Sequence, residues 1–159
     1  MKVIFLDIDG VLNGIEYQMS TTEAPPLIDV SRLEILKELI DKSNAKVVLS
    51  SSWKKAWVKG QTFDCIFKNA GIDIYDTTPV LGRKNSEISA WLSAHSDIES
   101  FVILDDADGG WGELSPNVVI TNPIQENGLE KKHIPLALEK LENNRHESPT
   151  FANSTTDCC

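Results

Sequence analysis

Two aspartates, Asp7 and Asp9, flank a single isoleucine directly after the short apolar run of residues 3–6. This spacing lets both carboxylates project toward one site while Ile8 turns back into the core, and Gly10 then permits a sharp turn. Two acids this close repel each other in a partly buried place unless a cation lies between them. The pattern therefore indicates a divalent-cation site, with a solvated turn after a strand as the simpler alternative.

A second acidic pair, Asp105 and Asp106, follows the apolar run of residues 101–104. If the two runs form neighbouring strands, four carboxylates meet at one edge of a sheet. Hard oxygen ligands suit Mg²⁺, which needs one or two protein carboxylates and keeps several waters. His and Cys are absent from the cluster, so zinc is disfavoured. Asp108 follows closely and is read as a loop residue rather than a third ligand.

Hydroxyl and cationic side chains complete the set. Ser50, Ser51 and Ser52 follow the apolar run of residues 46–49, and their hydroxyl and backbone N–H groups make a corner that can bind an oxyanion. One of the three is expected only to cap a helix. Lys84, next to Arg83, opens the helix that precedes the second acidic pair, where a cation would balance charge and hold a phosphoryl oxygen. Taken alone, an Arg-Lys pair usually marks only the surface.

The elements that must position these residues are short strands alternating with helices. Buried parallel strands are predicted where the chain is apolar on both faces: residues 3–6, 46–49, 101–104 and 118–120, with 72–75 as a weaker fifth. Helical patterns cover residues 31–41, 86–95 and 136–141. This alternation predicts an α/β fold with an open parallel sheet of about five strands and helices on both faces. Ligands of such sheets bind beyond the carboxyl ends of the strands, where every polar cluster falls.

Composition limits the class of protein. The chain has 159 residues, 41% of them hydrophobic, and a formal net charge of -9. We expect one globular domain over residues 1–144 and a disordered polar tail over residues 145–159. The charge has the wrong sign for a broad surface that binds nucleic acid, so any polyanion must be bound by a few residues at one place. Cys65 stands alone, the pair Cys158 and Cys159 lies in the tail, and no apolar run is long enough to span a membrane. These features predict a cytoplasmic protein without a membrane partner, as a monomer or weak homo-oligomer.

The order of these motifs resembles the haloacid dehalogenase (HAD) superfamily. The resemblance rests on Asp-Ile-Asp-Gly-Val-Leu-Asn at residues 7–13, the serines after Leu49, Lys84, and Leu-Asp-Asp at residues 104–106. It covers roughly residues 2–129. It implies a Rossmann-like catalytic domain and a Mg²⁺-dependent phosphohydrolase. An acid at position 9 favours the phosphatase branch over the dehalogenase branch.

The resemblance also implies catalytic roles for the acids. Asp7 would attack phosphorus in line and form an aspartyl phosphate. Asp9 would protonate the leaving oxygen and then activate water, while its backbone carbonyl helps to hold Mg²⁺. Asp106 resembles the residue that binds magnesium directly in the family, and Asp105 would support it or bind Lys84. The sequence also allows the two aspartates to exchange these roles.

The remaining motif positions imply contacts with the substrate. Ser51 would bind the transferring phosphoryl group together with Lys84, and Ser50 is the second choice because the register of a triple serine is not fixed by the sequence. Ser50, Ser52, Asn13 and Arg83 are the candidate substrate-binding residues.

The segments between the motifs are too short for a large cap domain. HAD enzymes that act on small molecules often carry a cap domain after the first motif or between the second and third. Residues 14–29 and 54–83 leave no room for a large cap. We therefore expect an open site suited to a phosphate on a macromolecule, unless a partner subunit supplies a lid.

Three short segments are similar to HAD domains associated with RNA repair proteins: Ser-Ser-Trp, Ile-Leu-Asp-Asp, and Asn-Gly-Leu at residues 127–129. The candidate substrates are thus a phosphorylated polynucleotide end or a small phosphorylated molecule. Basic and aromatic residues after the serines would form a small patch for stacking and phosphate contact: Lys54, Lys55, Lys59, Trp53 and Trp57. Tryptophans at helical spacing more often belong to the core.

Two other functions use the same residues. A catalytically silent HAD fold would serve as a phosphate- or metal-dependent binding module, although the intact pair Asp7 and Asp9 argues against it. A phosphotransferase would pass the phosphoryl group to an acceptor other than water.

Overall fold

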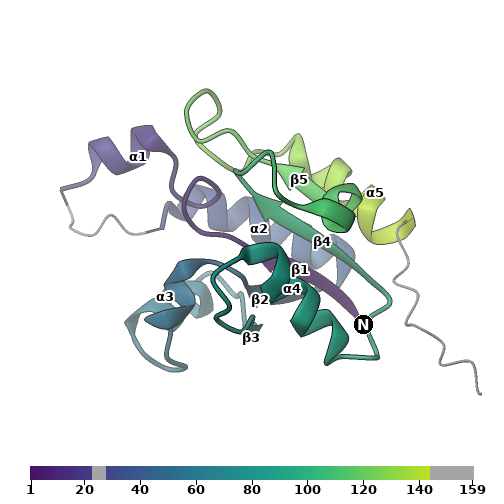
Figure 1. The fold of residues 1–159 in the computed structure, drawn as a ribbon. Helices are drawn as coiled ribbons and strands as arrows, with labels where there is room; N and C mark the ends of the chain where they lie inside the picture. Colours follow the sequence, from purple (N-terminus) through teal and green to yellow (C-terminus); the bar gives the residue numbers. More distant parts are fainter. Residues whose placement is uncertain (23–27, 144–159) are drawn as a thin grey trace, which may run out of the picture.

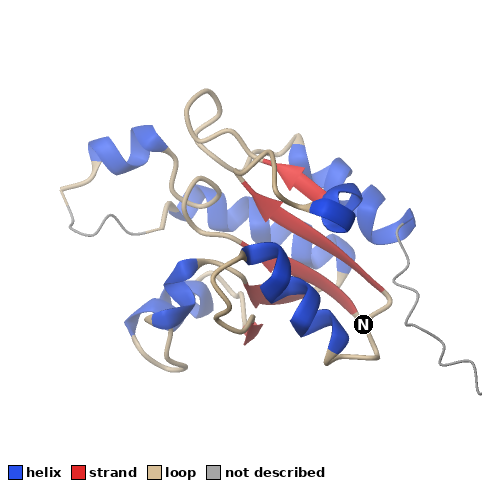
Figure 2. Cartoon of the chain, viewed as in Figure 1, coloured by secondary structure: helices blue, strands red, loops and turns tan. Residues whose placement is uncertain are grey.

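One parallel sheet forms the centre of the molecule in the computed structural model, which describes residues 1–22 and 28–143. The strand order is β3-β2-β1-β4-β5. The strands are β1 (Lys2–Leu6), β2 (Lys46–Leu49), β3 (Ile74–Thr77), β4 (Ser100–Asp105) and β5 (Val118–Ile120). The prediction of an open five-stranded parallel sheet is confirmed (Figure 2). The predicted polar tail, with Cys158 and Cys159, lies outside the described residues.

The register of the sheet brings the ends of three strands level. Leu6 at the end of β1 pairs with Leu49 of β2 on one side and with Leu104 of β4 on the other. Residues that follow these leucines therefore emerge together at the carboxyl edge of the sheet. The expectation that the strands carrying the two acidic pairs are neighbours is confirmed.

Helices cover both faces of the sheet. One face packs against α2 (Val30–Ser43), α3 (Thr62–Asn69) and α5 (His133–Asn143), and the other against α4 (Lys84–Ser93) and the 3₁₀ helix η2 (Gly112–Asn117). Figure 1 shows α2 and α4 on opposite sides of the central strands. The apolar residues alternate along β1, so that Leu6 faces the first group and Phe5 the second.

Element boundaries differ from the predictions by a few residues. Helix α4 begins two residues before the predicted start, because its first turn holds Lys84 and Asn85, which hydrophobic periodicity does not detect. Helix α5 begins three residues before the predicted start, with His133, Ile134 and Pro135 in its first turn. The fifth strand was predicted at residues 72–75, whereas β3 spans Ile74–Thr77. Ile72 is buried in the core just before the strand, which explains the shift.

No separate cap domain is present among the described residues, as expected. The segment after β1 contributes one short helix, α1 (Ile15–Ser20), which buries none of its residues and lies beyond the carboxyl ends of the strands (Figure 1). The segment after β2 contributes the 3₁₀ helix η1 (Ser52–Lys55), then α3 and β3. Among the helices of residues 1–22 and 28–143, none has both the length and the apolarity needed to cross a bilayer.

Candidate active site

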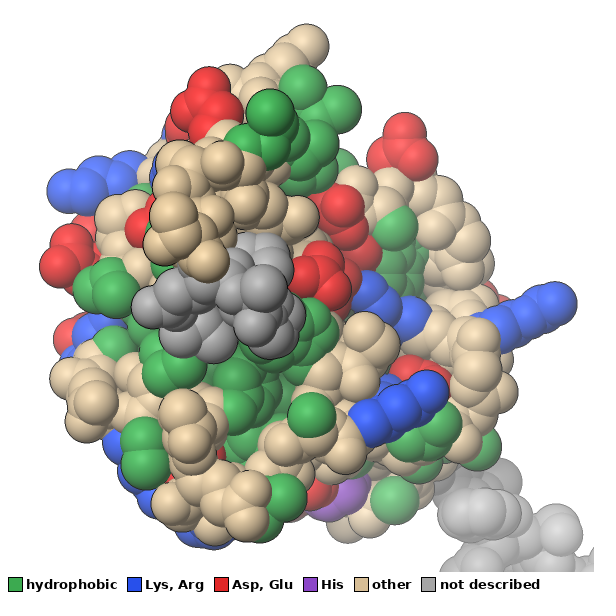
Figure 3. Space-filling view, turned by 90° about the vertical axis from the view of Figure 1, so that its left-hand side faces the viewer, with side chains coloured by type: hydrophobic (Ala, Val, Ile, Leu, Met, Phe, Trp, Pro, Cys, Tyr) green, Lys and Arg blue, Asp and Glu red, His purple; other side chains and the backbone are tan. Residues whose placement is uncertain are grey.

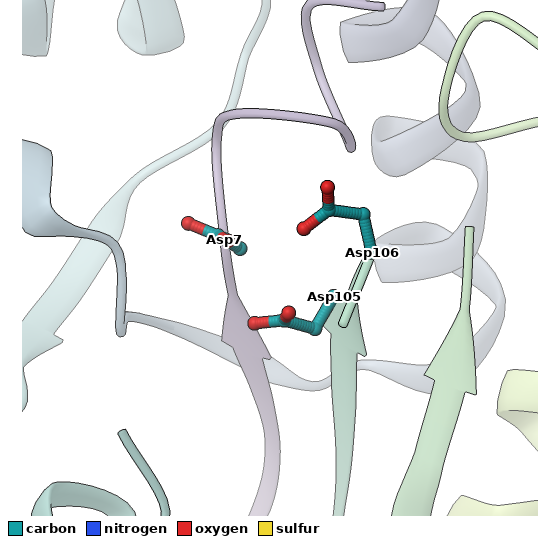
Figure 4. A group of neighbouring side chains, drawn as sticks. All are labelled: Asp7, Asp105 and Asp106. Carbon is teal, nitrogen blue, oxygen red and sulfur yellow. The ribbon is translucent and has the colours of Figure 1, made fainter. Parts of the chain in front are cut away.

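Three aspartates meet at the carboxyl edge of the sheet. Asp7 directly follows β1, Asp105 ends the adjacent strand β4, and Asp106 follows it. Each offers a carboxylate oxygen, and these oxygens lie within 4.8 Å of one another. Figure 4 shows the three side chains turned toward a common space. The expected convergence is therefore observed for three of the four carboxylates, since the side chain of Asp9 is not part of this group.

Lys84 bridges two of these acids. Its Nζ donates to Asp7 Oδ2 at 2.6 Å and to Asp105 Oδ2 at 2.5 Å. Burial by itself would lower the pKa of Lys84, but the charges of Asp7 and Asp105 and their hydrogen bonds outweigh it, so the pKa is raised. The ammonium therefore stays protonated between the two carboxylates.

The two consecutive aspartates are in different surroundings. Asp105 is fully buried, and its Oδ1 accepts the backbone N–H of Ala107 at 2.9 Å, so both oxygens are occupied. Burial, followed by the charge of Asp7, raises the pKa of Asp105 to about 6 despite the contact with Lys84. The Asp106 carboxylate has no hydrogen bond or ion pair to any other described residue, and desolvation and Asp7 raise its pKa as well.

The geometry fits a divalent cation. Three carboxylates face a single ammonium, so the cluster keeps excess negative charge when all three are ionised. Gly10, at φ +76°, lies so close to Asp106 that a Cβ there would overlap the carboxylate. The buried Thr121 hydroxyl donates to the Gly10 carbonyl at 2.8 Å and fixes this turn. Oxygen donors around a tight backbone turn are the ligands that Mg²⁺ prefers.

Asp9 is held from both sides by neutral donors. The Trp53 indole Nε1 donates to Asp9 Oδ2 at 2.9 Å, and Asn13 Nδ2 donates to Asp9 Oδ1 at 3.1 Å. Asn13 is buried and also accepts the Gly10 N–H at 3.3 Å. The carboxylate of Asp9 is thus oriented, although the residue is exposed. The sequence suggested Trp53 only as a member of the stacking patch, and its hydrogen bond to Asp9 was not predicted.

The three serines have three different environments. Ser50 is level with Asp7, since its N–H donates to the Leu6 carbonyl at 2.9 Å, and its buried Oγ has no hydrogen-bond partner among the described residues. Ser51 caps η1 by accepting the Trp53 N–H at 3.4 Å. Ser52 is exposed. The expectation that one serine serves as a cap fits Ser51.

A family of known domains matches this chain. The family described as "HAD domain in Swiss Army Knife RNA repair proteins" matches residues 3–134, a span that holds both acidic pairs, the serines and Lys84. The chain belongs to this family. It therefore has a phosphohydrolase-type HAD fold, and the resemblance to the RNA repair subgroup is confirmed. Searches of curated proteins and of solved structures returned no match.

A buried ion pair ties η1 of this HAD domain to the start of α4. Lys54 Nζ donates to Glu87 Oε2 at 2.6 Å, to Thr78 Oγ1 at 2.8 Å and to the Pro79 carbonyl at 3.0 Å. Glu87 Oε1 accepts two backbone N–H groups from the loop that leads to Lys84. Burial acts to raise the pKa of Glu87, but Lys54 and these N–H groups outweigh it, and the pKa is lowered.

The predicted basic and aromatic patch is wrong in part. Lys54 is buried in its ion pair and has no free ammonium to offer a phosphate. Trp57 packs against the core, and its indole N–H donates to Asp64 Oδ1 at 3.3 Å. Lys55 and Lys59 are exposed. The spacing of these residues in the sequence did not show that Lys54 would form an ion pair with the buried Glu87.

The Asn-Gly-Leu segment braces the loop that carries Asp9. Gly128 lies at φ +101°, and a Cβ there would come 2.5 Å from the Val11 carbonyl oxygen. The Leu129 N–H donates to that same carbonyl at 2.8 Å. The Asn-Gly-Leu segment therefore holds the loop after β1 in position and does not itself line the site.

Several of the predicted site residues reach the surface at the carboxyl edge of the sheet. Figure 3 looks onto the carboxyl edge of the sheet: acidic and basic side chains lie next to one another near its centre, and hydrophobic side chains gather beside them. Of the predicted site residues at this edge, Asp9, Asp106, Ser52 and Arg83 are exposed, whereas Asp108 lies outside the acidic cluster.

Proposed function

We propose that this HAD domain is a Mg²⁺-dependent phosphomonoesterase that works through an aspartyl phosphate on Asp7 and acts on the phosphorylated end of a polynucleotide. The observation that carries the proposal is the arrangement around Asp7. Its carboxylate is hydrogen-bonded to Lys84, it lies beside the open carboxylate of Asp106, and Asp9 is oriented two residues away.

In the first half-reaction, an Asp7 oxygen attacks phosphorus as the bond from phosphorus to the ester oxygen breaks. Asp9, in its protonated form, gives its proton to the departing oxygen, which leaves as an alcohol. Lys84 stabilises negative charge on the transferring phosphoryl group while it keeps Asp7 in place. The two hydrogen bonds to Asp9 support this role, because they hold its carboxyl in one orientation.

In the second half-reaction, Asp9 accepts a proton from water, and the oxygen of that water attacks the phosphorus of the aspartyl phosphate. The bond between phosphorus and the Asp7 oxygen breaks, so that inorganic phosphate leaves and the carboxylate is restored. Asp7, Asp106 and the Asp9 backbone carbonyl are the residues that would hold Mg²⁺, with Asp105 in support through Lys84. When bound, Mg²⁺ offsets the charge of the acidic cluster and of the phosphoryl oxygens.

We assign the phosphoryl-binding hydroxyl to Ser50 and the capping hydroxyl to Ser51, which reverses the order expected from the sequence. Ser50 is level with Asp7, and its buried Oγ has no partner among the described residues. A buried hydroxyl without a partner is costly, and a phosphoryl oxygen would relieve that cost. The Oγ of Ser51 accepts the Trp53 N–H, so its burial does not leave it without a partner as that of Ser50 does.

A polynucleotide end is the substrate class that the observations favour. The family is named for RNA repair proteins. The site has no cap among the described residues, so a long substrate can reach Asp7 without the opening of a lid. The acidic surface, with a net charge of -9, requires that recognition be local to the site.

The test is phosphate release from nucleotides, sugar phosphates and oligonucleotides that carry a 3′- or 5′-phosphate, with and without Mg²⁺. We expect turnover of the oligonucleotides that depends on Mg²⁺ and is lost in Asp7→Asn. Asp108→Asn is the matched control, since it removes a nearby carboxylate outside the acidic cluster.

Three outcomes would contradict the proposal in distinct ways. Equal activity of the wild type and Asp7→Asn would exclude Asp7 as the nucleophile. Tight binding of phosphorylated ends without turnover would identify a binding module. Phosphate that appears on an added alcohol, and not in water, would identify a phosphotransferase.

A further inference from the structure

Two cavities flank the acidic cluster on opposite sides. One, of about 570 Å³, lies toward β5 and α5 and is bordered by Asp106. The other, of about 360 Å³, lies toward the first turn of α4 and is bordered by Lys84 and Asp105. We call them the β5-side cavity and the α4-side cavity. A substrate whose terminal phosphate lies at Asp7 can place its next group in either cavity, and the charges of the two cavities decide which one suits a second phosphate.

The charges of the two cavities are opposite. The β5-side cavity is lined by Asp106, Asp108 and Glu126, and its Lys132 is already paired with Glu126 and a second glutamate. The net charge of its lining residues is negative, so it repels a polyanion.

The α4-side cavity is lined by two cations, Arg83 and Lys84, and by one carboxylate, Asp105, which is neutralised by Lys84. The guanidinium of Arg83 has no hydrogen bond or ion pair with any residue in the described part of the chain. Other lysines that the sequence suggested for phosphate contact are less suitable, since Lys54 is buried in its pair with Glu87. Arg83 is therefore a cation without a partner beside the reacting centre.

We propose that the α4-side cavity is a subsite for the phosphodiester next to the terminal phosphate, with Arg83 as its ligand. The strand then leaves the site along α4 and not across β5. This inference rests on the proposed function, because it takes the terminal phosphate to lie at Asp7.

The shape of the cavity agrees with such a ligand. Arg83 directly precedes Lys84, and consecutive Cα atoms lie about 3.8 Å apart, so the two cations serve adjacent positions. Gly109 and Gly110 line the cavity, and a Cβ at either would meet nothing within 4 Å, so open space lies in front of the backbone. A planar guanidinium binds a phosphate through two parallel N–H bonds, which gives geometric selectivity as well as charge.

The experiment compares a mononucleotide that bears one terminal phosphate with a dinucleotide that bears the same phosphate and one phosphodiester, in 3′ and 5′ series. We expect the wild type to prefer the dinucleotide about tenfold in kcat/KM, the effect of one charge-assisted contact. Arg83→Gln should lose this preference, with a much smaller effect on the mononucleotide. Lys132→Gln removes a cation from the β5-side cavity and should leave the preference intact. With a phosphorylated oligonucleotide as substrate, the slope of log kcat/KM against log salt concentration should be shallower by about 0.7 for Arg83→Gln, since one counterion fewer is released from the single strand.

Each result decides the inference. If Arg83→Gln lowers both substrates equally, Arg83 contacts the transferred phosphoryl group and the subsite is excluded. If Lys132→Gln abolishes the preference, the strand runs over β5. A wild type that prefers a phosphopeptide to both nucleotides would also overturn it.

Binding separates this failure from failure of the hydrolase proposal. Fluorescence anisotropy with a labelled oligonucleotide that carries a terminal phosphate, measured on Asp7→Asn, requires no turnover. About tenfold weaker binding of the oligonucleotide after the additional change Arg83→Gln, with little change for a labelled mononucleotide that carries the same terminal phosphate, would support the subsite even if the protein did not hydrolyse the phosphate. Unchanged binding would refute it.

Discussion

Replacing Trp53 with phenylalanine tests whether the indole N–H orients Asp9 for proton transfer. The change removes the donor 2.9 Å from Asp9 Oδ2 and keeps an aromatic ring against Phe63, 5.2 Å away between ring centroids. A hydrogen bond to a charged group contributes about 1.5–3 kcal/mol. Water can partly replace the donor because Asp9 is exposed. We therefore expect a loss of about 1–2 kcal/mol in transition-state stabilisation, or roughly five- to thirtyfold in kcat.

The assay is steady-state phosphate release at saturating Mg²⁺, with Tm measured in parallel. For Trp53→Phe we expect a lower kcat, a KM close to that of the wild type, and a Tm within a few degrees of it. Trp57→Phe is the matched control: its indole donates at 3.3 Å to Asp64, outside the site, so stability should fall and kcat should not. An unchanged kcat in Trp53→Phe, or an equal loss in both variants, would refute the argument.

The remaining predictions concern the metal, the buried ion pair and pH. Gly10→Ala should weaken Mg²⁺ binding, measured by calorimetry, at least about tenfold, because the added Cβ overlaps the Asp106 carboxylate. Gly60 has a similar φ, +83°, but open space around it, so Gly60→Ala should leave Mg²⁺ binding unchanged. Lys54→Met leaves the buried Glu87 carboxylate unpaired and should lower the free energy of unfolding, measured with denaturant, by about 3–5 kcal/mol. Lys42→Met, which breaks an exposed ion pair, should lower it by less than about 1 kcal/mol. The pKa of Asp105 is raised from 3.8 to about 6, so its contribution to stability is full below 3.8 and lost as pH rises through about 6. The Tm of the metal-free protein should therefore fall over that range, and the increase in Tm caused by Mg²⁺ should be larger at pH 7 than at pH 5.

The sheet and the acidic cluster were predictable because both depend on local signals. Runs that are apolar on both faces identify buried parallel strands, and the polar residues that end these runs must lie at the carboxyl edge. The alternation of strands and helices allowed the two strands to be neighbours, and the pairing of Leu6 with Leu104 brings Asp7 close to Asp105.

The contacts that hold the site residues in position were not predictable, because they join segments that are distant in the sequence. Nothing near Trp53 in the sequence indicates that its indole reaches Asp9, 44 positions away. The partner of Lys54 is Glu87, 33 positions away, and neither residue differs in type from an ordinary surface charge. The choice between Ser50 and Ser51 likewise depends on the start of η1, which a run of three identical residues does not fix.

The short turn η1 links several parts of the proposed machinery. Ser51 caps it, Trp53 extends to Asp9, and Lys54 extends to Glu87, whose carboxylate holds the loop before Lys84. Residues 1–22 and 28–143 contain no lid over the site, so the positions of its groups must be set in advance by fixed contacts and not by closure. Because three of four consecutive residues make these contacts, a displacement of η1 would misplace the acid/base group and the lysine together. Trp53→Phe and Lys54→Met should then be less than additive in kcat, since Lys54→Met displaces η1 and already removes the contact between Trp53 and Asp9.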